Sequence, residues 1–387
     1  MRRPDPATLD ILKTLVGFPT VSRDSNLELI EWVRDYLAEH GIESVLTRGE
    51  DARKANLFAT IGNGSGGIIL SGHTDVVPVD GQAWSTDPFE LTERDGKLYG
   101  RGTCDMKGFI AVALAKVSVL KAAAGEEPIH LAFSFDEEIG CKGVGHMLAD
   151  LAARGLSPRG CIVGEPTSMN TVVGHKAGAV YSCTVSGLEV HSSLAPQGVN
   201  AVEYASRLVN RIAEIAERMA QEERRHDGYE VPYSTMQTGV IGGGHAANIV
   251  PAACTFRFDI RTLPWTDPEA LITEVRDFAE TALLPRMHTI APNAAIEIVR
   301  IGHVPGFAID DDAPLTRYVQ RLNRSNAAPR HVTFGSEAGL FQARAIPAVI
   351  CGPGSISQAH KPDEFISLEQ LALCEDFMDR LAATAFE

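Results

Sequence analysis

The chain has 387 residues, which is long for a single hydrophobic core, so two domains are the first expectation. Its composition, 44% hydrophobic and 22% charged, is that of a globular protein and excludes collagen-like, disordered and disulfide-scaffold classes. The formal net charge of −15 argues against nucleic acid or an anionic membrane surface as a partner, because both require basic patches on the protein.

The cysteines and the apolar segments give no sign of secretion or membrane insertion. The seven cysteines are scattered singly, and their odd number would leave one thiol unpaired in any disulfide scheme. Reduced thiols in a cytoplasm are the better interpretation. The N-terminal MRRPDPATLD has no apolar stretch, and the most apolar segment, Phe109–Leu120, is interrupted by Lys116 and too short to span a bilayer. We expect a cytoplasmic protein without a membrane anchor.

Helical and strand patterns alternate over the first 175 residues. The segments with helical periodicity are Pro6–Val16, Leu27–His40, Met106–Ala123 and Gly143–Ala153. The short apolar runs expected to form strands are Asn56–Ile61, Gly67–Ser71, Ile129–Phe135 and Gly160–Val163. This alternation predicts an α/β fold with a mixed, mostly parallel sheet that is sandwiched by helices.

The pattern then changes to that of a small α+β domain. Strand, helix, strand, strand, helix and strand are expected in turn at Val180–Gly187, Ala201–Glu223, Thr235–Ile241, Cys254–Thr262, Pro268–Ala282 and Ala295–Gly302. This order is the split βαβ arrangement of ferredoxin-like domains. Alternation resumes with a helix at Pro314–Asn323 and a strand at Pro347–Cys351. We expect a catalytic domain of residues 1–176 and 304–387, with residues 177–303 inserted as a separate domain.

Acidic or histidine side chains follow several of these strands or lie in adjacent loops. The residues are His73 in SGHTD, Asp105 in GRGTCDMKG, Glu138 in FSFDEEIG, Glu165 in VGEPT and His360 in GPGSISQAH. Open α/β sheets build their sites at the carboxyl ends of parallel strands. Two histidines and three carboxylates are enough for two metal ions that share one bridging carboxylate and keep an open position for water.

Each motif alone has an ordinary structural alternative. His73 would be a buried structural histidine, and Asp105 would be a helix N-cap. The acidic run Asp136–Glu138 would be a solvated loop, although three adjacent carboxylates after a buried strand repel one another unless a cation compensates them. His360 would be an unremarkable loop histidine. The metal interpretation therefore depends on the set of motifs.

As a set, SGHTDVVPV, GRGTCDMKG, FSFDEEIG, VGEPT and GPGSISQAHKPDE resemble the motifs of the aminoacylase/carboxypeptidase family of dinuclear-zinc peptidases. They run in order from Gly72 to Glu364, so the resemblance covers nearly the whole chain. It implies a zinc-peptidase-like fold and two divalent metal ions, zinc or alternatively cobalt, since nitrogen and oxygen ligands accept several metals.

The resemblance also implies a role for each matching residue. Asp105 would bridge the metals, with His73 and Glu165 completing one site and Glu138 and His360 the other. Glu137 would be the general base, and Asp75 would orient His73 from behind. A cis peptide bond is implied between Asp105 and Met106.

Three residues of the inserted domain match positions near the substrate in this family. By resemblance, His191 stabilises the oxyanion and is delivered into the partner subunit's site of a homodimer. Asn248 and Arg261 would bind substrate, and a guanidinium suits a substrate carboxylate. An ordinary loop histidine and a surface charge on an edge strand are the alternatives for His191 and Arg261.

The substrate is expected to be a small N-acyl amino acid. By resemblance, the GSEAG segment lines the substrate site of this family. The charge of Glu337 would then suit a cationic side chain, which favours N2-acetyl-L-ornithine, hydrolysed to L-ornithine and acetate in arginine biosynthesis. A desuccinylase of succinyl-diaminopimelate or a glutamate carboxypeptidase would share every ligand. A non-catalytic binding protein on the same fold is a further alternative, disfavoured because no ligand and no base is missing.

Overall fold

The computed structural model describes residues 2–124 and 127–384. Contacts between Cα atoms divide the chain into two compact units. The first consists of Met1–Gly174, Phe307–His331 and Ser336–Glu387, and the second of His175–Gly306 and Val332–Gly335. Among the described residues, no helix is long and apolar enough to cross a membrane.

The first unit is built around a mixed sheet. Its strands are β1 (Ser44–Arg48), β2 (Ala55–Ile61), β6 (Ile129–Ser134), β3 (Ile68–His73), β7 (Gly160–Pro166), β15 (Ala348–Gly352), β8 (Val172–His175) and β13 (Phe307–Ala308), in spatial order. The central strands β6, β3, β7 and β15 are parallel, whereas β1, β2 and β8 pair antiparallel to their neighbours. β14 (Arg330–Val332) pairs with β8, and β4 (Thr92–Arg94), β5 (Lys97–Tyr99) and β16 (Phe365–Ser367) form a separate small sheet.

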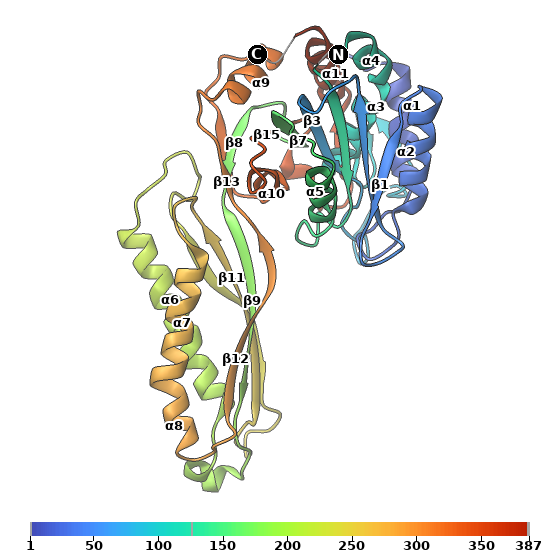
Figure 1. Ribbon diagram of the computed structural model, residues 1–387. Helices are drawn as coiled ribbons and strands as arrows, with labels where there is room; N and C mark the ends of the chain where they lie inside the picture. Colours follow the sequence, from blue (N-terminus) through green and yellow to red (C-terminus); the bar gives the residue numbers. More distant parts are fainter. Residues whose placement is uncertain (1, 125–126, 385–387) are drawn as a thin grey trace. The chain divides into compact units, whose positions relative to one another are not determined.

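Helices cover both faces of this sheet (Figure 1). One face packs into the main core cluster with α1 (Pro6–Gly17), α2 (Leu27–Glu39), α3 (Gly108–Ala115), α4 (Val117–Ala123), α9 (Pro314–Asn323) and α11 (Leu368–Ala383). The other face carries α5 (Val144–Ala153) and α10 (Ala338–Gln342), which contact each other. Every residue of β3 and β7 is buried, and each strand contains a short apolar run, Ile68–Leu70 in β3 and Cys161–Val163 in β7, as expected for strands that are covered on both faces. The predicted fold class is confirmed.

The segment predicted as one helix, Met106–Ala123, has a different form. It consists of an irregular turn, Thr103–Lys107, followed by α3 and α4 with a break at Lys116. Backbone dihedrals at Asp105 and Met106 are not helical, and the peptide bond between them is cis. The prediction of an unbroken helix was therefore wrong, because the chain turns sharply where it presents Asp105.

The second unit contains a four-stranded antiparallel sheet in the order β10–β11–β9–β12. Its elements along the chain are β9 (Ala177–Ser186), α6 (Ala201–Glu222), β10 (Thr235–Gly243), β11 (Ala253–Thr262), α7 (Pro268–Phe278), α8 (Leu284–His288) and β12 (Ala295–Val304). Alternate residues such as Tyr181 and Phe256 are buried beneath α6, which turns Leu208 and Ile212 inward. This order of strands and helices is the predicted ferredoxin-like arrangement.

Candidate metal centre

Four neighbouring parallel strands of the first unit end at one cluster of side chains. His73 is the last residue of β3, and Glu165 is the penultimate residue of β7. Glu137 and Glu138 follow β6, and His360 lies in the loop after β15. The carboxyl edge of the parallel strands is thus where the predicted ligands meet, as sheet topology requires.

The Asp105 carboxylate lies between the two imidazoles. Its Oδ1 is 3.0 Å from Nε2 of His73, and its Oδ2 is 3.3 Å from Nε2 of His360. On the outer sides of this arrangement, His73 Nε2 lies 3.6 Å from Glu165 Oε1, and His360 Nε2 lies 3.0 Å from Glu138 Oε2. Each imidazole therefore faces the shared Asp105 and one further carboxylate.

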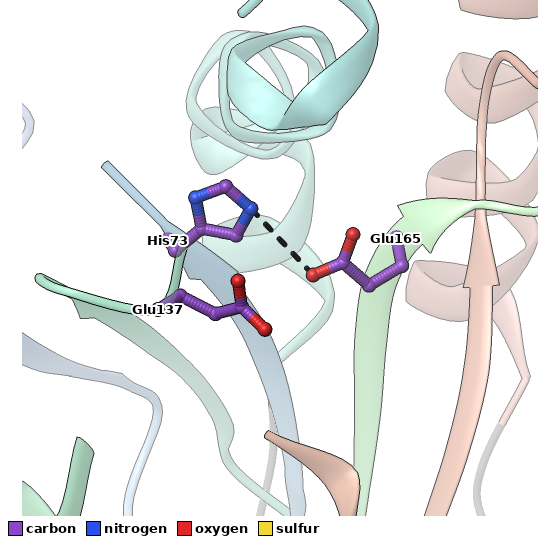
Figure 2. A group of neighbouring side chains, drawn as sticks. All are labelled: His73, Glu137 and Glu165. Carbon is purple, nitrogen blue, oxygen red and sulfur yellow. Dashed lines mark ion pairs between the residues drawn. The ribbon is translucent and has the colours of Figure 1, made fainter. Parts of the chain in front are cut away.

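Glu137 also turns its carboxylate toward this cluster. Figure 2 shows His73, Glu137 and Glu165 converging from three segments of the chain. Ligand atoms of these three residues lie within 4.8 Å of one another, and the same is true of His73, Asp105 and Glu138. The adjacent Glu137 and Glu138 thus both reach the cluster, and only Glu138 pairs with His360.

Asp75 contacts both His73 and the acidic loop, whereas only its contact with His73 was predicted from the sequence. The His73 Nδ1 hydrogen bonds to the main-chain carbonyl oxygen of Asp75 at 2.8 Å, whereas the nearest carboxylate oxygen is 3.7 Å away. The carboxylate instead accepts hydrogen bonds from the backbone N–H groups of Glu137 (3.1 Å) and Glu138 (3.3 Å). Asp75 therefore orients the imidazole with its backbone and the acidic loop with its side chain.

A second buried carboxylate, Glu364, holds the turn that carries Asp105. It accepts hydrogen bonds from the backbone N–H groups of Gly102, Cys104 and Asp105, and its Oε2 lies 2.7 Å from Nη1 of Arg101. Both Glu364 and Arg101 are only 1% exposed. Sequence reasoning assigned neither a role, although both stand inside the quoted motifs.

Burial and mutual repulsion shift the pKa values of these groups. Burial raises the pKa of Glu138 to about 7, and it raises the pKa values of Glu137 and Glu165 well above their usual range. Burial opposes the ionised form of Asp105 too, but hydrogen bonds from both histidines outweigh it and lower the pKa. Hydrogen bonds to Asp105 and Glu138 raise the pKa of His360 to about 10. Carboxylates gathered in this way need a compensating positive charge.

The residues fit divalent cations. The donor set is two imidazoles and three carboxylates, the ligands that zinc and similar metals take in proteins. Within the described residues, the buried Oε1 of Glu138 has no hydrogen-bond partner, although an ionised buried oxygen needs one. A metal ion would satisfy this oxygen and relieve the repulsion at once.

The other predicted residues are not part of the ligand cluster, although Glu337 lies close to it. Glu337, 1% exposed, accepts a hydrogen bond from Ser71 Oγ at 3.2 Å, and its negative charge helps to raise the pKa of Glu137. In the second unit, His191 and Asn248 are close together, since His191 bridges to Ile249 and the N–H of Ser192 donates to the Asn248 carbonyl.

Arg261 is not near that pair within the second unit. It pairs with Gly178 at one end of the β9–β11 ladder, whereas the ribbon continues past Ser186 and Ala253, at the other end, to reach His191. The ladder has ten residue pairs, or about 30 Å at about 3.3 Å per residue. The Arg261 guanidinium is bonded to Asp259 at 3.0 Å.

The family follows from comparison with known sequences. The pattern of the Peptidase family M20/M25/M40 matches residues 69–384, and the chain belongs to this family of hydrolases. Among its relatives, the acetylornithine deacetylase of Pasteurella multocida is 33% identical over 97% of both chains. The enzyme of the same name from Proteus mirabilis is 32% identical over 97% of this chain and 96% of its own.

A solved structure of similar fold is the YXEP protein of Bacillus subtilis, described as a dinuclear metal binding peptidase from the M20 family. The TM-score is 0.68 at 15% sequence identity, covering 97% of this chain and 96% of the other. At this identity the likeness concerns the fold alone.

Proposed function

We propose that this protein is a metal-dependent amidohydrolase that converts N2-acetyl-L-ornithine to L-ornithine and acetate. The observation that carries the proposal is the Asp105 carboxylate held between His73 and His360, with Glu137 beside it. The names of the two relatives support the choice of substrate. The product would serve arginine biosynthesis.

The ligand roles are proposed as the geometry suggests. Asp105 would bridge two metal ions, with His73 and Glu165 on one and Glu138 and His360 on the other. Bound divalent metal supplies Lewis acidity and lowers the pKa of water. Zinc is the proposed ion, with cobalt as the alternative, because nitrogen and oxygen ligands of this kind accept both.

Glu137 is proposed as the general base. Its backbone N–H is held by Asp75, which leaves its carboxylate directed at the cluster. Burial raises the pKa of Glu137, which suits a group that must first take a proton from the attacking water and then give it to the leaving nitrogen. A nearby cation favours the ionised form that the first step requires.

Recognition of the substrate is assigned to three residues. Glu337 would attract the ornithine δ-amine, Arg261 would bind the α-carboxylate, and Asn248 would contribute a hydrogen bond. Because Glu337 is buried beside Ser71, it would attract the δ-amine through the negative charge of a fixed carboxylate, and not as a mobile side chain that closes over the substrate.

A homodimer follows from the same assignment. His191, proposed to stabilise the oxyanion, and Arg261 lie at opposite ends of a ladder about 30 Å long. An N-acyl amino acid is far shorter than this, so two residues of one rigid sheet cannot both contact it. If both act on one substrate, His191 and the neighbouring Asn248 must come from a second subunit. A fully active monomer in sedimentation analysis would refute this arrangement.

The cytoplasm is the proposed compartment. All seven cysteines are free and buried. Free cysteines are the rule where thiols are kept reduced.

The substrate is tested with a panel of N-acyl amino acids and zinc- or cobalt-reconstituted enzyme. We expect kcat/KM to be highest for N2-acetyl-L-ornithine. Preference for succinyl-diaminopimelate or for a glutamate-terminated peptide would reassign the enzyme to the corresponding activity. Absence of turnover with every compound, despite bound metal, would favour a binding protein.

The residue roles are tested with Glu137→Ala and with chelation. We expect Glu137→Ala to abolish turnover and leave the metal content nearly unchanged. Chelation should remove turnover from the wild type, and added zinc or cobalt should restore it. Loss of metal with activity retained in Glu137→Ala would show that the roles are wrongly assigned.

A further inference from the structure

The loop that carries Glu137 and Glu138 begins in an unusual backbone conformation. Asp136 has a φ of +55°, in the left-handed region that residues other than glycine seldom adopt. Its main-chain oxygen accepts a hydrogen bond from the N–H of Lys142 at 3.0 Å, which closes the loop. The direction in which the next two side chains leave the backbone depends on this conformation.

Lys54 holds Asp136 in place. Its Nζ lies 2.5 Å from Oδ1 of Asp136 and 2.5 Å from the main-chain oxygen of Ser22. Lys54 is 6% and Asp136 8% exposed, so the ion pair is shielded from water. The lysine backbone is itself fixed just before β2, because its N–H donates to the carbonyl oxygen of Asp51 and its own carbonyl oxygen accepts from the N–H of Gly49.

Ser22, the second partner of Lys54, is also connected to the loop that carries Glu137 and Glu138. Ser22 Oγ donates to Oδ2 of Asp75 at 2.7 Å, and the Asp75 carboxylate accepts the N–H groups of Glu137 and Glu138. Lys54 thus acts on the loop directly through Asp136 and indirectly through Ser22 and Asp75. Removing the ammonium would release both attachments and leave Asp136 buried without its cation.

We propose that Lys54 is a positioning residue, which through Asp136 and Ser22 aims the carboxylates of Glu137 and Glu138 at the metal centre. Lys54 contacts neither substrate nor metal in this role. The inference rests on the proposed function of Glu137 and Glu138, and it adds the group that orients them. Loss of hydrogen bonds behind a metal ligand typically lowers metal affinity or activity about 10- to 100-fold.

The test compares Lys54→Met, Lys54→Arg and Asp136→Asn with Lys116→Met. Lys116 is the control, because it is also a buried lysine of the same unit, 8% exposed, but it bridges Asp5 and Asp379 at 3.1 Å, and neither of these carboxylates is bonded to the loop of Glu137 and Glu138. The measurements are the affinity for cobalt(II), the visible spectrum of the cobalt-substituted protein, and kcat and KM for N2-acetyl-L-ornithine at saturating metal.

We expect Lys54→Met and Asp136→Asn to weaken cobalt affinity about tenfold and to lower kcat about 10- to 100-fold, with KM changed less than about threefold. Lys54→Arg should recover part of the loss, and Lys116→Met should change neither quantity more than about twofold. If Lys54→Met does not fold, Asp136→Asn decides the result, since it keeps the lysine.

Two outcomes would overturn the proposal. One is unchanged cobalt affinity, spectrum and kcat in both Lys54→Met and Asp136→Asn. The other is an equal loss in Lys116→Met, which would mark a general effect of removing a lysine ammonium from the first unit. If the wild type hydrolyses no N-acyl amino acid, the proposed function is wrong. The role of Lys54 is then tested by the cobalt affinity and the visible spectrum alone.

Discussion

Replacing Glu364 by glutamine should destabilise the first unit strongly. The carboxylate is surrounded by four donors: the Arg101 guanidinium at 2.7 Å and three backbone N–H groups at 2.9 to 3.2 Å. Burial raises the pKa of Glu364, but a protonated carboxyl would direct its O–H at donors alone. The arrangement of partners therefore favours the ionised form at neutral pH.

The magnitude follows from what glutamine cannot do. Its amide NH2 would face either the N–H groups of Cys104 and Asp105 or the Arg101–Gly102 side, so one pair of hydrogen bonds becomes a donor–donor contact. Arg101 is 1% exposed and would lose its counter-charge. Removing one partner of a buried ion pair costs about 3–5 kcal/mol. In Glu364→Gln, Arg101 would still donate a hydrogen bond to Gln82 Oε1 at 2.6 Å. We therefore expect a cost in the lower part of this range.

The assay is urea unfolding followed by tryptophan fluorescence. Trp84 lies 5.0 Å from the Arg101 guanidinium and reports on this region. The control is Glu93→Gln, because Glu93 forms a two-point ion pair with Arg3 at 2.7 Å but the side chains are 40% and 54% exposed. That substitution should change the free energy of unfolding little, because solvent screens an exposed ion pair. Equal free energies of unfolding for the two variants would refute the reasoning.

Further predictions concern stability. Burial lowers the pKa of His130, which stays neutral when folded, while the unfolded chain gains a proton below about pH 6.5. The free energy of unfolding should therefore decrease as the pH is lowered from 7.5 to 5.5. In His130→Phe this decrease should be smaller than in the wild type, by up to about 1 kcal/mol, as measured by urea unfolding at both pH values. An equal fall in both proteins would show that His130 does not contribute. Gly352→Ala should reduce stability by about 3 kcal/mol or prevent folding, because a Cβ atom would lie 1.9 Å from the Gly164 carbonyl oxygen. Gly145→Ala in α5 meets no atom within 4 Å and should raise stability by about 0.5–1 kcal/mol; a reversed order of these two variants in thermal unfolding would contradict the packing argument.

Local pattern was sufficient to predict much of the fold. The apolar run of β3 and the helical periodicity of α9 are properties of a few consecutive residues, and α9 has the predicted bounds, Pro314–Asn323. The helix α11 was not predicted. Neither the strand order β6–β3–β7–β15 nor the break at Lys116 follows from local periodicity, because pairing and ion pairs join residues far apart in the chain.

The candidate site divides in the same way. The residue types at His73, Asp105, Glu138, Glu165 and His360, together with their positions after strands, were enough to predict metal chemistry from the sequence by itself. Only the tertiary structure decided that His73 bonds to the carbonyl oxygen of Asp75, that Glu364 bonds to the turn that carries Asp105, and that Lys54 bonds to Asp136. A ligand is recognised by its own chemistry and its neighbours in the chain. A supporting residue is defined by which donor meets which acceptor in three dimensions, and that depends on packing between distant segments.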